Sequence, residues 1–194
     1  MSITVSSRDS LPGIEPMFPE RWSPRAFDGS PINEEILTRV FEAARWSPSC
    51  FNEQPWRFYT STENTQAQFL SLLVEANQGW AQTAPVIGFL VGQKVFARNG
   101  KPNASCELDC GAAWMAMSLQ ARAEGLYTHG MAGIKYEEAA TYLGLNTETQ
   151  AVLMGFVIGR KGSLEALPEA LREGETPSPR VALDEIWLRP QETS

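Results

Sequence analysis

The segment Arg21-Trp22-Ser23-Pro24-Arg25 places two guanidinium groups and a hydroxyl at every second position. In an extended segment Arg21, Ser23 and Arg25 lie on one face, because alternate side chains point the same way. Two guanidinium groups and a hydroxyl can satisfy a phosphate and a ring carbonyl. The alternative is a pair of surface arginines in solvated ion pairs, and spacing alone leaves both interpretations open.

A second polar segment, Pro48–Pro55, carries Ser49, Asn52 and Gln54 immediately before a predicted strand. Hydroxyl and amide side chains in such a turn are suited to lining a ligand, since they offer both donors and acceptors. The alternative is a plain connection between a helix and a strand.

Other chemistries lack their signatures. The sequence has no Gly-x-Gly-x-x-Gly after a strand, no phosphate-binding P-loop and no Gly-x-Ser-x-Gly turn. His129 is the one histidine and is interpreted as a packed or surface residue. The three cysteines, Cys50, Cys106 and Cys110, are too few for a disulfide framework. Cys106 and Cys110, one turn apart on a predicted helix, are interpreted as core thiols. We therefore expect no metal site.

The composition narrows the possible partners. Of 194 residues, 23 are acidic and 16 are Lys or Arg, giving a net charge of −7, which argues against general binding to nucleic acid or an anionic membrane. An anionic ligand would need a local basic pocket within this acidic surface. The polar start Met1–Ser10 and the lack of a long apolar run predict neither a signal peptide nor a membrane span. These features and the unpaired cysteines favour a cytoplasmic protein.

The elements that would position these side chains alternate between helices and strands. The patterns predict helices over residues 34–46, 65–76, 107–124 and 136–143, and strands over residues 56–60, 85–91, 151–159 and part of 125–133. Asn33 is the expected N-cap of the first helix. No repeat or linker divides the chain, so residues 1–194 are expected to form one domain, with arms at 1–20 and 180–194.

The helix predicted over residues 107–124 carries no charge between Asp109 and Arg122, and Gly125 should end it. A helix that is apolar around its whole circumference is expected to be buried all round. It is therefore either a central core helix or part of a subunit interface.

The order of these motifs resembles the FMN-dependent nitroreductase family over residues 20–188. The resemblance is carried by Arg-x-Ser-x-Arg-x-Phe at 21–27, Ala44–Ser49, Asn52-x-Gln54-Pro55-Trp56-x-Phe58, Asn77-Gln78 before Ala84-Pro85, Asp109-x-Gly111-Ala112, Gly125-Leu126, Gly130–Gly133 and Arg180-x-x-Leu183-x-Glu185. Each motif is weak alone, but together they follow the family's order. The resemblance implies an α+β fold with a central, mostly antiparallel sheet flanked by helices, in an intertwined homodimer that exchanges C-terminal arms.

The resemblance also implies residue roles around FMN. Arg21 and Ser23 would hold the ribityl phosphate, with backbone contacts from Trp22, and Arg180 would close over it. Arg25 would face the N1/C2 carbonyl edge of the flavin, and Asn77 would hydrogen-bond its pyrimidine side.

Two backbone segments complete the implied site. The N–H groups of Ala132 and Gly133 would lie beside flavin N5. The loop formed by Pro48, Ser49, Cys50 and Asn52 would reach the flavin of the partner subunit.

Three departures from the family pattern concern specificity. Cys50 stands where a small hydroxyl residue is common, and Ser178 stands where many members carry a second base. The loop 93–104 is short, which implies an open site with a small lid.

The implied activity is transfer of hydride from NAD(P)H through flavin N5 to small electron-poor acceptors such as nitroaromatics, quinones and enones, in a ping-pong cycle. The flavin carries the chemistry, so no side chain is assigned as catalytic. The alternatives are a non-catalytic flavin carrier or sensor, and a specialised member that fragments flavin, dehalogenates or oxidises peptides.

Overall fold

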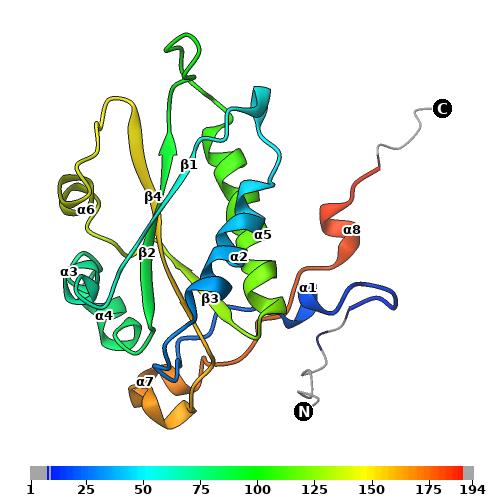
Figure 1. Cartoon of the computed structure of the whole chain (residues 1–194). Helices are drawn as coiled ribbons and strands as arrows, with labels where there is room; N and C mark the ends of the chain where they lie inside the picture. Colours follow the sequence, from blue (N-terminus) through cyan, green and yellow to red (C-terminus); the bar gives the residue numbers. More distant parts are fainter. Residues whose placement is uncertain (1–7, 9, 190–194) are drawn as a thin grey trace.

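The computed structural model describes residues 8 and 10–189 (Figure 1). Its strands are β1 (Trp56–Thr60), β2 (Val86–Gln93), β3 (Tyr127–Met131) and β4 (Gln150–Gly159). Its longer helices are α2 (Glu34–Arg45), α3 (Gln66–Ser71), α4 (Glu75–Ala81), α5 (Cys106–Ala123) and α6 (Tyr136–Tyr142). The short helical turns are α1 (Met17–Glu20), η1 (Cys50–Asn52), η2 (Leu164–Ala166), α7 (Glu169–Arg172) and α8 (Leu183–Ile186).

The four strands form one sheet in the order β1-β2-β4-β3, and every neighbouring pair is antiparallel. The central strands β2 and β4 are covered on both sides, as the continuous apolar runs in their sequences predict. The α+β class and the antiparallel sheet expected from the sequence are confirmed.

Helices cover the two faces of the sheet as separate layers (Figure 1). On one face α3, α4 and α6 pack through residues such as Phe69 and Trp80 onto Ile87 and Phe89. On the other face α2 and α5 pack onto residues that include Phe156. Alternate residues of one strand thus face two different cores, because side chains alternate across a sheet.

Local signals place several element boundaries correctly. The side chain of Asn33 accepts a hydrogen bond from the Glu35 N–H at 2.7 Å, so the predicted N-cap of α2 is confirmed. Gly125 has a φ of +78° directly after α5, as its predicted role as the stop of this helix requires. The single helix predicted over residues 65–76 is wrong. The chain breaks into α3 and α4 there, because Leu73 leaves the helix to form a β-bridge with Ile134.

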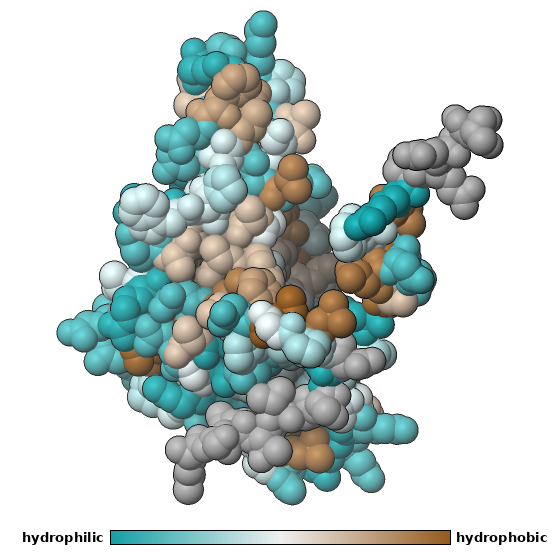
Figure 2. Space-filling view, turned by 90° about the vertical axis from the view of Figure 1, so that its right-hand side faces the viewer, coloured by the Kyte–Doolittle hydropathy of each residue, from teal (hydrophilic) through white to brown (hydrophobic). Residues whose placement is uncertain are grey.

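The prediction that α5 is buried all round does not hold within one chain. Ala113 and Met117 are buried, but Leu108 is 77% and Met115 is 36% exposed. Exposed Gly111 lies between them at helical spacing, so these residues form an uncovered apolar stripe. Figure 2 shows apolar atoms across the middle of this face. Within one chain, α5 is therefore a core helix on one side only.

The C-terminal segment projects away from the body of the chain (Figure 1). Its apolar side chains are exposed, with Ile186, Trp187 and Leu188 at 68%, 59% and 75%. Residues 1–7 and 9 of the predicted N-terminal arm lie outside the described residues, as do residues 190–194 of the C-terminal arm. Between residues 8 and 189, no helix combines the length and the hydrophobicity that crossing a membrane requires.

Candidate functional site

The segment that follows α1 has the alternating geometry predicted from its sequence. Trp22, Pro24 and Ala26 are buried, whereas Arg21, Ser23 and Arg25 are only partly buried. Arg21 has an extended backbone, with φ −68° and ψ 120°. The two arginines and the serine therefore share the more open face of the segment.

Aromatic and hydrogen-bonding contacts hold this segment against the edge strand β3. The rings of Trp22 and Tyr127 meet edge to face with centroids 6.2 Å apart. Nδ1 of His129 lies 2.9 Å from the Pro24 carbonyl oxygen, and the His129 ring lies 4.6 Å from that of Trp80. His129 is thus a packing residue, as interpreted from the sequence. Burial lowers its pKa, with a further lowering from the nearby charge of Arg25.

A buried carboxylate fixes the far end of the segment. Oε1 of Glu175 accepts hydrogen bonds from the backbone N–H groups of Arg25 and Ala26, at 2.7 and 2.9 Å. Its Oε2 is buried without a partner among the described residues. Glu175 lies only five residues before Arg180, so it links the two stretches that carry the predicted phosphate ligands.

Three arginines, Arg8, Arg21 and Arg180, form an arginine cluster. A guanidinium nitrogen of Arg8 donates to the Arg21 carbonyl oxygen at 2.9 Å. Burial lowers the pKa of Arg21 most strongly, and the charges of Arg180 and Arg8 lower it further, so the three groups lie within electrostatic reach. None of the ion pairs formed by residues 8 and 10–189 involves these arginines. Three cations gathered without a carboxylate in an acidic chain make a site suited to a phosphate.

The polypeptide immediately after β3 offers backbone donors. No described carbonyl accepts a hydrogen bond from the N–H of Ala132 or Gly133. Asn77 supports this turn, since its Nδ2 donates to the Gly133 carbonyl oxygen at 2.9 Å and its Oδ1 accepts from Trp80. A Cβ at Gly133 would lie 2.5 Å from Nδ2 of Asn77, so a larger residue there would displace the Asn77 side chain. The amide that the sequence assigned to a flavin contact is therefore engaged by the protein itself.

The Pro48–Pro55 loop is more than a plain connection. Phe51, Asn52 and Gln54 have φ values of 53°, 57° and 49°, a conformation that side-chain-bearing residues rarely adopt. Oγ of Ser49 accepts from the Gln54 N–H at 3.0 Å, and the Cys50 N–H donates to the buried Asp109 carboxylate at 3.1 Å. Strain of this kind occurs mainly where surrounding structure enforces it, often at functional sites.

The structure does not bring all the predicted site residues together within one chain. Cys50 contacts Asp109 near the start of α5, whereas Arg122 near its end lies 3.5 Å from Glu20, next to Arg21. Arg122 lies thirteen positions beyond Asp109 in the helix, which corresponds to about 20 Å. Figure 1 shows the turn after α2 at one end of α5 and α1 at the other. Arg21, Trp22, Ser23, Arg25, Arg180, Asn77, Ala132 and Gly133 thus belong to one end of the fold, and the Pro48–Asn52 loop belongs to the other.

Two contributors to this site have no clear sequence signal. Arg8 is a single base within an arm rich in proline, and Glu175 is one of several acids in residues 160–180. Arg8 contacts Arg21, 13 positions away in the sequence, and Glu175 contacts Arg25, 150 positions away.

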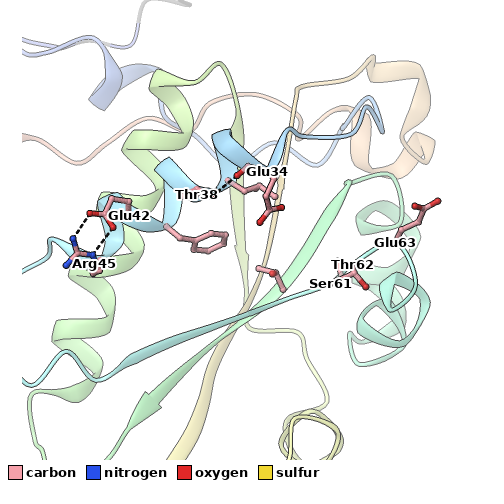
Figure 3. A pocket seen from close by; sticks show the side chains of 10 residues that line it. Glu34, Thr38, Glu42, Arg45, Ser61, Thr62 and Glu63 are labelled. Carbon is pink, nitrogen blue, oxygen red and sulfur yellow. Dashed lines mark hydrogen bonds and ion pairs between the residues drawn. The ribbon is translucent and has the colours of Figure 1, made fainter.

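Other features of the chain are separate from this site. Cys106 and Cys110 are buried in the core between α5 and the sheet, as predicted, and the residues that the structure describes include no cluster of three metal-ligating side chains. An open groove of about 680 Å³ runs between α2 and the end of β1 (Figure 3). It is lined by Glu34, Leu37, Thr38, Phe41, Glu42, Arg45 and Thr60–Glu63, none of which belongs to the predicted site.

Comparisons with known proteins agree with this architecture. A sequence model of the nitroreductase family matches residues 19–78 and 60–160. An oxidoreductase containing FMN, known from its crystal structure, is 36% identical with a TM-score of 0.90, and the match covers 100% of this chain and 99% of that one. The chain belongs to the nitroreductase family.

Two named relatives are more distant. The CLA biosynthesis enone reductase of Lactiplantibacillus plantarum is 25% identical, with coverage of 72% of this chain and 82% of that enzyme. A Streptomyces coelicolor protein, named as an NADH dehydrogenase/NAD(P)H nitroreductase, is 32% identical over 38% of this chain. That match spans only 37% of the Streptomyces protein.

Proposed function

We propose that this chain is an FMN-dependent oxidoreductase that takes hydride from NAD(P)H and reduces small electron-poor acceptors. Its membership of the nitroreductase family and its similarity to an oxidoreductase containing FMN support the cofactor and the reaction class. The named NAD(P)H nitroreductase and enone reductase relatives favour NAD(P)H as the donor and nitroaromatics and enones as acceptors. Quinones are included because the family resemblance implies them. The cytoplasmic location remains part of the proposal. It is predicted from the polar start of the chain, the lack of a long apolar run and the unpaired cysteines.

The observation that carries this proposal is the arginine cluster. Arg8, Arg21 and Arg180 gather positive charge in a chain of net charge −7. A phosphate at this point would relieve the repulsion among three guanidinium groups and use their fixed donor geometry. We assign Arg21, Ser23 and Arg180 to the phosphate of FMN, and we add Arg8 to the set predicted from the sequence.

The remaining residues of the same end suit the ring system. Arg25 lies two residues beyond Ser23 on the open face of the segment, where its charge can stabilise negative charge at the N1/C2 carbonyl edge. The N–H groups of Ala132 and Gly133 supply donors for N5, and Asn77 holds their turn in place. Trp22 contributes its backbone and fixes the segment to β3.

A homodimer would complete the site. Pro48, Ser49, Cys50 and Asn52 lie at the far end of α5 from the arginine cluster, so they can contact a flavin only if it is held by a second chain. The uncovered stripe around Met115 and the exposed apolar arm around Trp187 provide surfaces for such a partner. We propose that residues 1–194 form one domain that dimerises through α5 and exchanges C-terminal arms.

When bound, FMN accepts a hydride and passes electrons to the second substrate, which is the chemistry that no side chain of this site could supply. The arginine cluster and Ser23 would hold the phosphate, and Arg25 would offer a cation to the ring. No described side chain of the site is placed as a general acid or nucleophile.

Anaerobic titration of the purified protein with NADPH or NADH tests the proposal. The flavin absorbance of the protein should bleach and should return when nitrobenzene or menadione is added. Bound flavin that neither reductant bleaches would favour the carrier or sensor alternative, and a protein that retains no flavin would contradict the proposal altogether.

A further inference from the structure

A compact group of aromatic and basic side chains lies where the strained Pro48–Pro55 loop meets the 93–104 loop, away from the arginine cluster. The guanidinium carbon of Arg98 lies 4.0 Å from the ring centroid of Phe51 and 5.2 Å from that of Phe96. The two rings meet edge to face at 5.9 Å. We refer to Phe51, Phe96 and Arg98 as the aromatic platform.

The aromatic platform is held by two loops that brace each other. The backbone N–H of Ala97 donates to the Glu53 carboxylate and so ties the 93–104 loop to the turn of Phe51. That loop is itself a narrow hairpin, with a bridge between Val95 and Pro102 and a 2.8 Å hydrogen bond from the Phe96 N–H to the Lys101 carbonyl. The positions of Phe51 and Arg98 are therefore set by the fold.

Two features of Phe51 are unfavourable in free energy: its backbone conformation and its exposure to water. Its φ of 53° is strained for a residue with a bulky side chain, and the residue is 70% exposed to water. Packing against Arg98 covers only part of it. An aromatic ring presented at the cost of both strain and exposure is placed for contact with another molecule.

Charge indicates which kind of molecule this is. The hairpin contains Lys94, Arg98 and Lys101 and no acidic residue, within a chain of net charge −7. The Arg98 guanidinium makes no ion pair with any residue in the described part of the chain. Its guanidinium carbon lies over the Phe51 ring, and its N–H groups remain for a bidentate anion.

We propose that the aromatic platform selects planar, electron-poor acceptors that carry a carboxylate. The acceptor ring stacks on the exposed part of Phe51 while its carboxylate pairs with the edge of Arg98. The inference rests on the proposed function, because the loop of Cys50 and Asn52 is assigned there to the flavin site of the partner. The platform would then lie at the entrance of that site, where an acceptor must pass.

Matched acceptors test the proposal directly. Flavin-loaded protein reduced with one equivalent of NADPH is mixed with 4-nitrobenzoate or with its neutral analogue 4-nitrobenzamide, and the second-order rate of flavin reoxidation is measured. Arg98→Gln should lower the rate with 4-nitrobenzoate about tenfold, as expected for the loss of a charge-assisted contact, and should change the rate with 4-nitrobenzamide less than about twofold. Phe51→Leu should slow both acceptors by similar factors, because it removes the ring and retains the charge.

The chain provides a control for removing an arginine that is stacked on an aromatic ring. Arg45 lies 5.0 Å from the ring centroid of Trp46, but its donors are taken by Glu42, whose pKa falls to about 2 through this hydrogen-bonded pair. Arg45→Gln should therefore leave the ratio of the two acceptor rates unchanged. An unchanged ratio in Arg98→Gln, or an equal fall for both acceptors, would overturn the proposal.

A binding measurement separates this proposal from the proposed function. Calorimetric titration of the oxidised protein with 4-nitrobenzoate should give a dissociation constant about tenfold weaker in Arg98→Gln than in the wild type. If NADPH fails to bleach the flavin, the proposed function fails while this titration still decides whether Arg98 binds the carboxylate. Equal affinity of the wild type and Arg98→Gln would reject the assignment.

Discussion

Replacing Glu175 tests how the phosphate and ring ends of the site are held together. In Glu175→Ala the N–H groups of Arg25 and Ala26 lose their shared acceptor, in a place where Ala26 is 1% exposed. Hydrogen bonds to a charged group contribute about 1.5–3 kcal/mol each. Removing the buried charge recovers part of this free energy, because Oε2 of Glu175 has no hydrogen-bond partner among the described residues. We expect a net loss of about 2–4 kcal/mol in the free energy of unfolding.

Glu175→Gln is the matched variant, because its amide oxygen can still accept the two hydrogen bonds without the negative charge. It should lose only about 1 kcal/mol, since neutral hydrogen bonds are roughly half as strong. Urea unfolding at fixed protein and FMN concentrations measures both losses, and flavin fluorescence measures FMN affinity. The affinity should fall at least tenfold in Glu175→Ala and less in Glu175→Gln. Wild-type urea midpoint and FMN affinity in Glu175→Ala would refute the role of Glu175 as the link between the two stretches.

Three further changes address the phosphate site, the interface and the response to pH. Arg21→Ala should weaken FMN binding more than Ser23→Ala, since a charged phosphate contact is worth about 1.5–3 kcal/mol against about 0.5–1.5 for a neutral one; equal affinities by fluorescence titration would remove Arg21 from the phosphate site. Met115→Glu should prevent dimer assembly, because a carboxylate buried in an interface without a partner costs several kcal/mol; a flavin-loaded dimer in light scattering would place position 115 in water. The pKa of His129 is lowered in the folded chain, so its neutral form stabilises the fold above the ordinary histidine value of about 6.5, and this stability declines as the pH falls below that value. Urea midpoints between pH 7 and 5 should therefore fall less in His129→Gln, and identical pH profiles would exclude His129 as a cause.

Much of the fold follows from local patterns in the sequence. The apolar run before Gly92, the Asn33 cap and the Gly125 stop each act over a few residues, so they could be recognised without the structure. The break between α3 and α4 could not, because it depends on a bridge between Leu73 and Ile134, far apart in the chain.

The site residues also fall into two groups: those that the local sequence marks and those that only the folded chain brings to the site. The alternation of Arg21, Ser23 and Arg25 is a local signal, and their burial pattern matches it. Arg8 and Glu175 join the site only through the folded chain, so no spacing in the sequence marks them. The assignment of individual residues to atoms of FMN remains a prediction from the family resemblance.

Light scattering during size-exclusion chromatography, combined with flavin absorbance, tests the central claim most directly. The claim is that the arginine cluster of one chain and the Pro48–Asn52 loop of another hold the same FMN. It predicts a species of twice the 21.5 kDa chain mass with one FMN per chain. A species of 21.5 kDa that carries a full complement of FMN would contradict it, because one chain holds the two parts at opposite ends of α5.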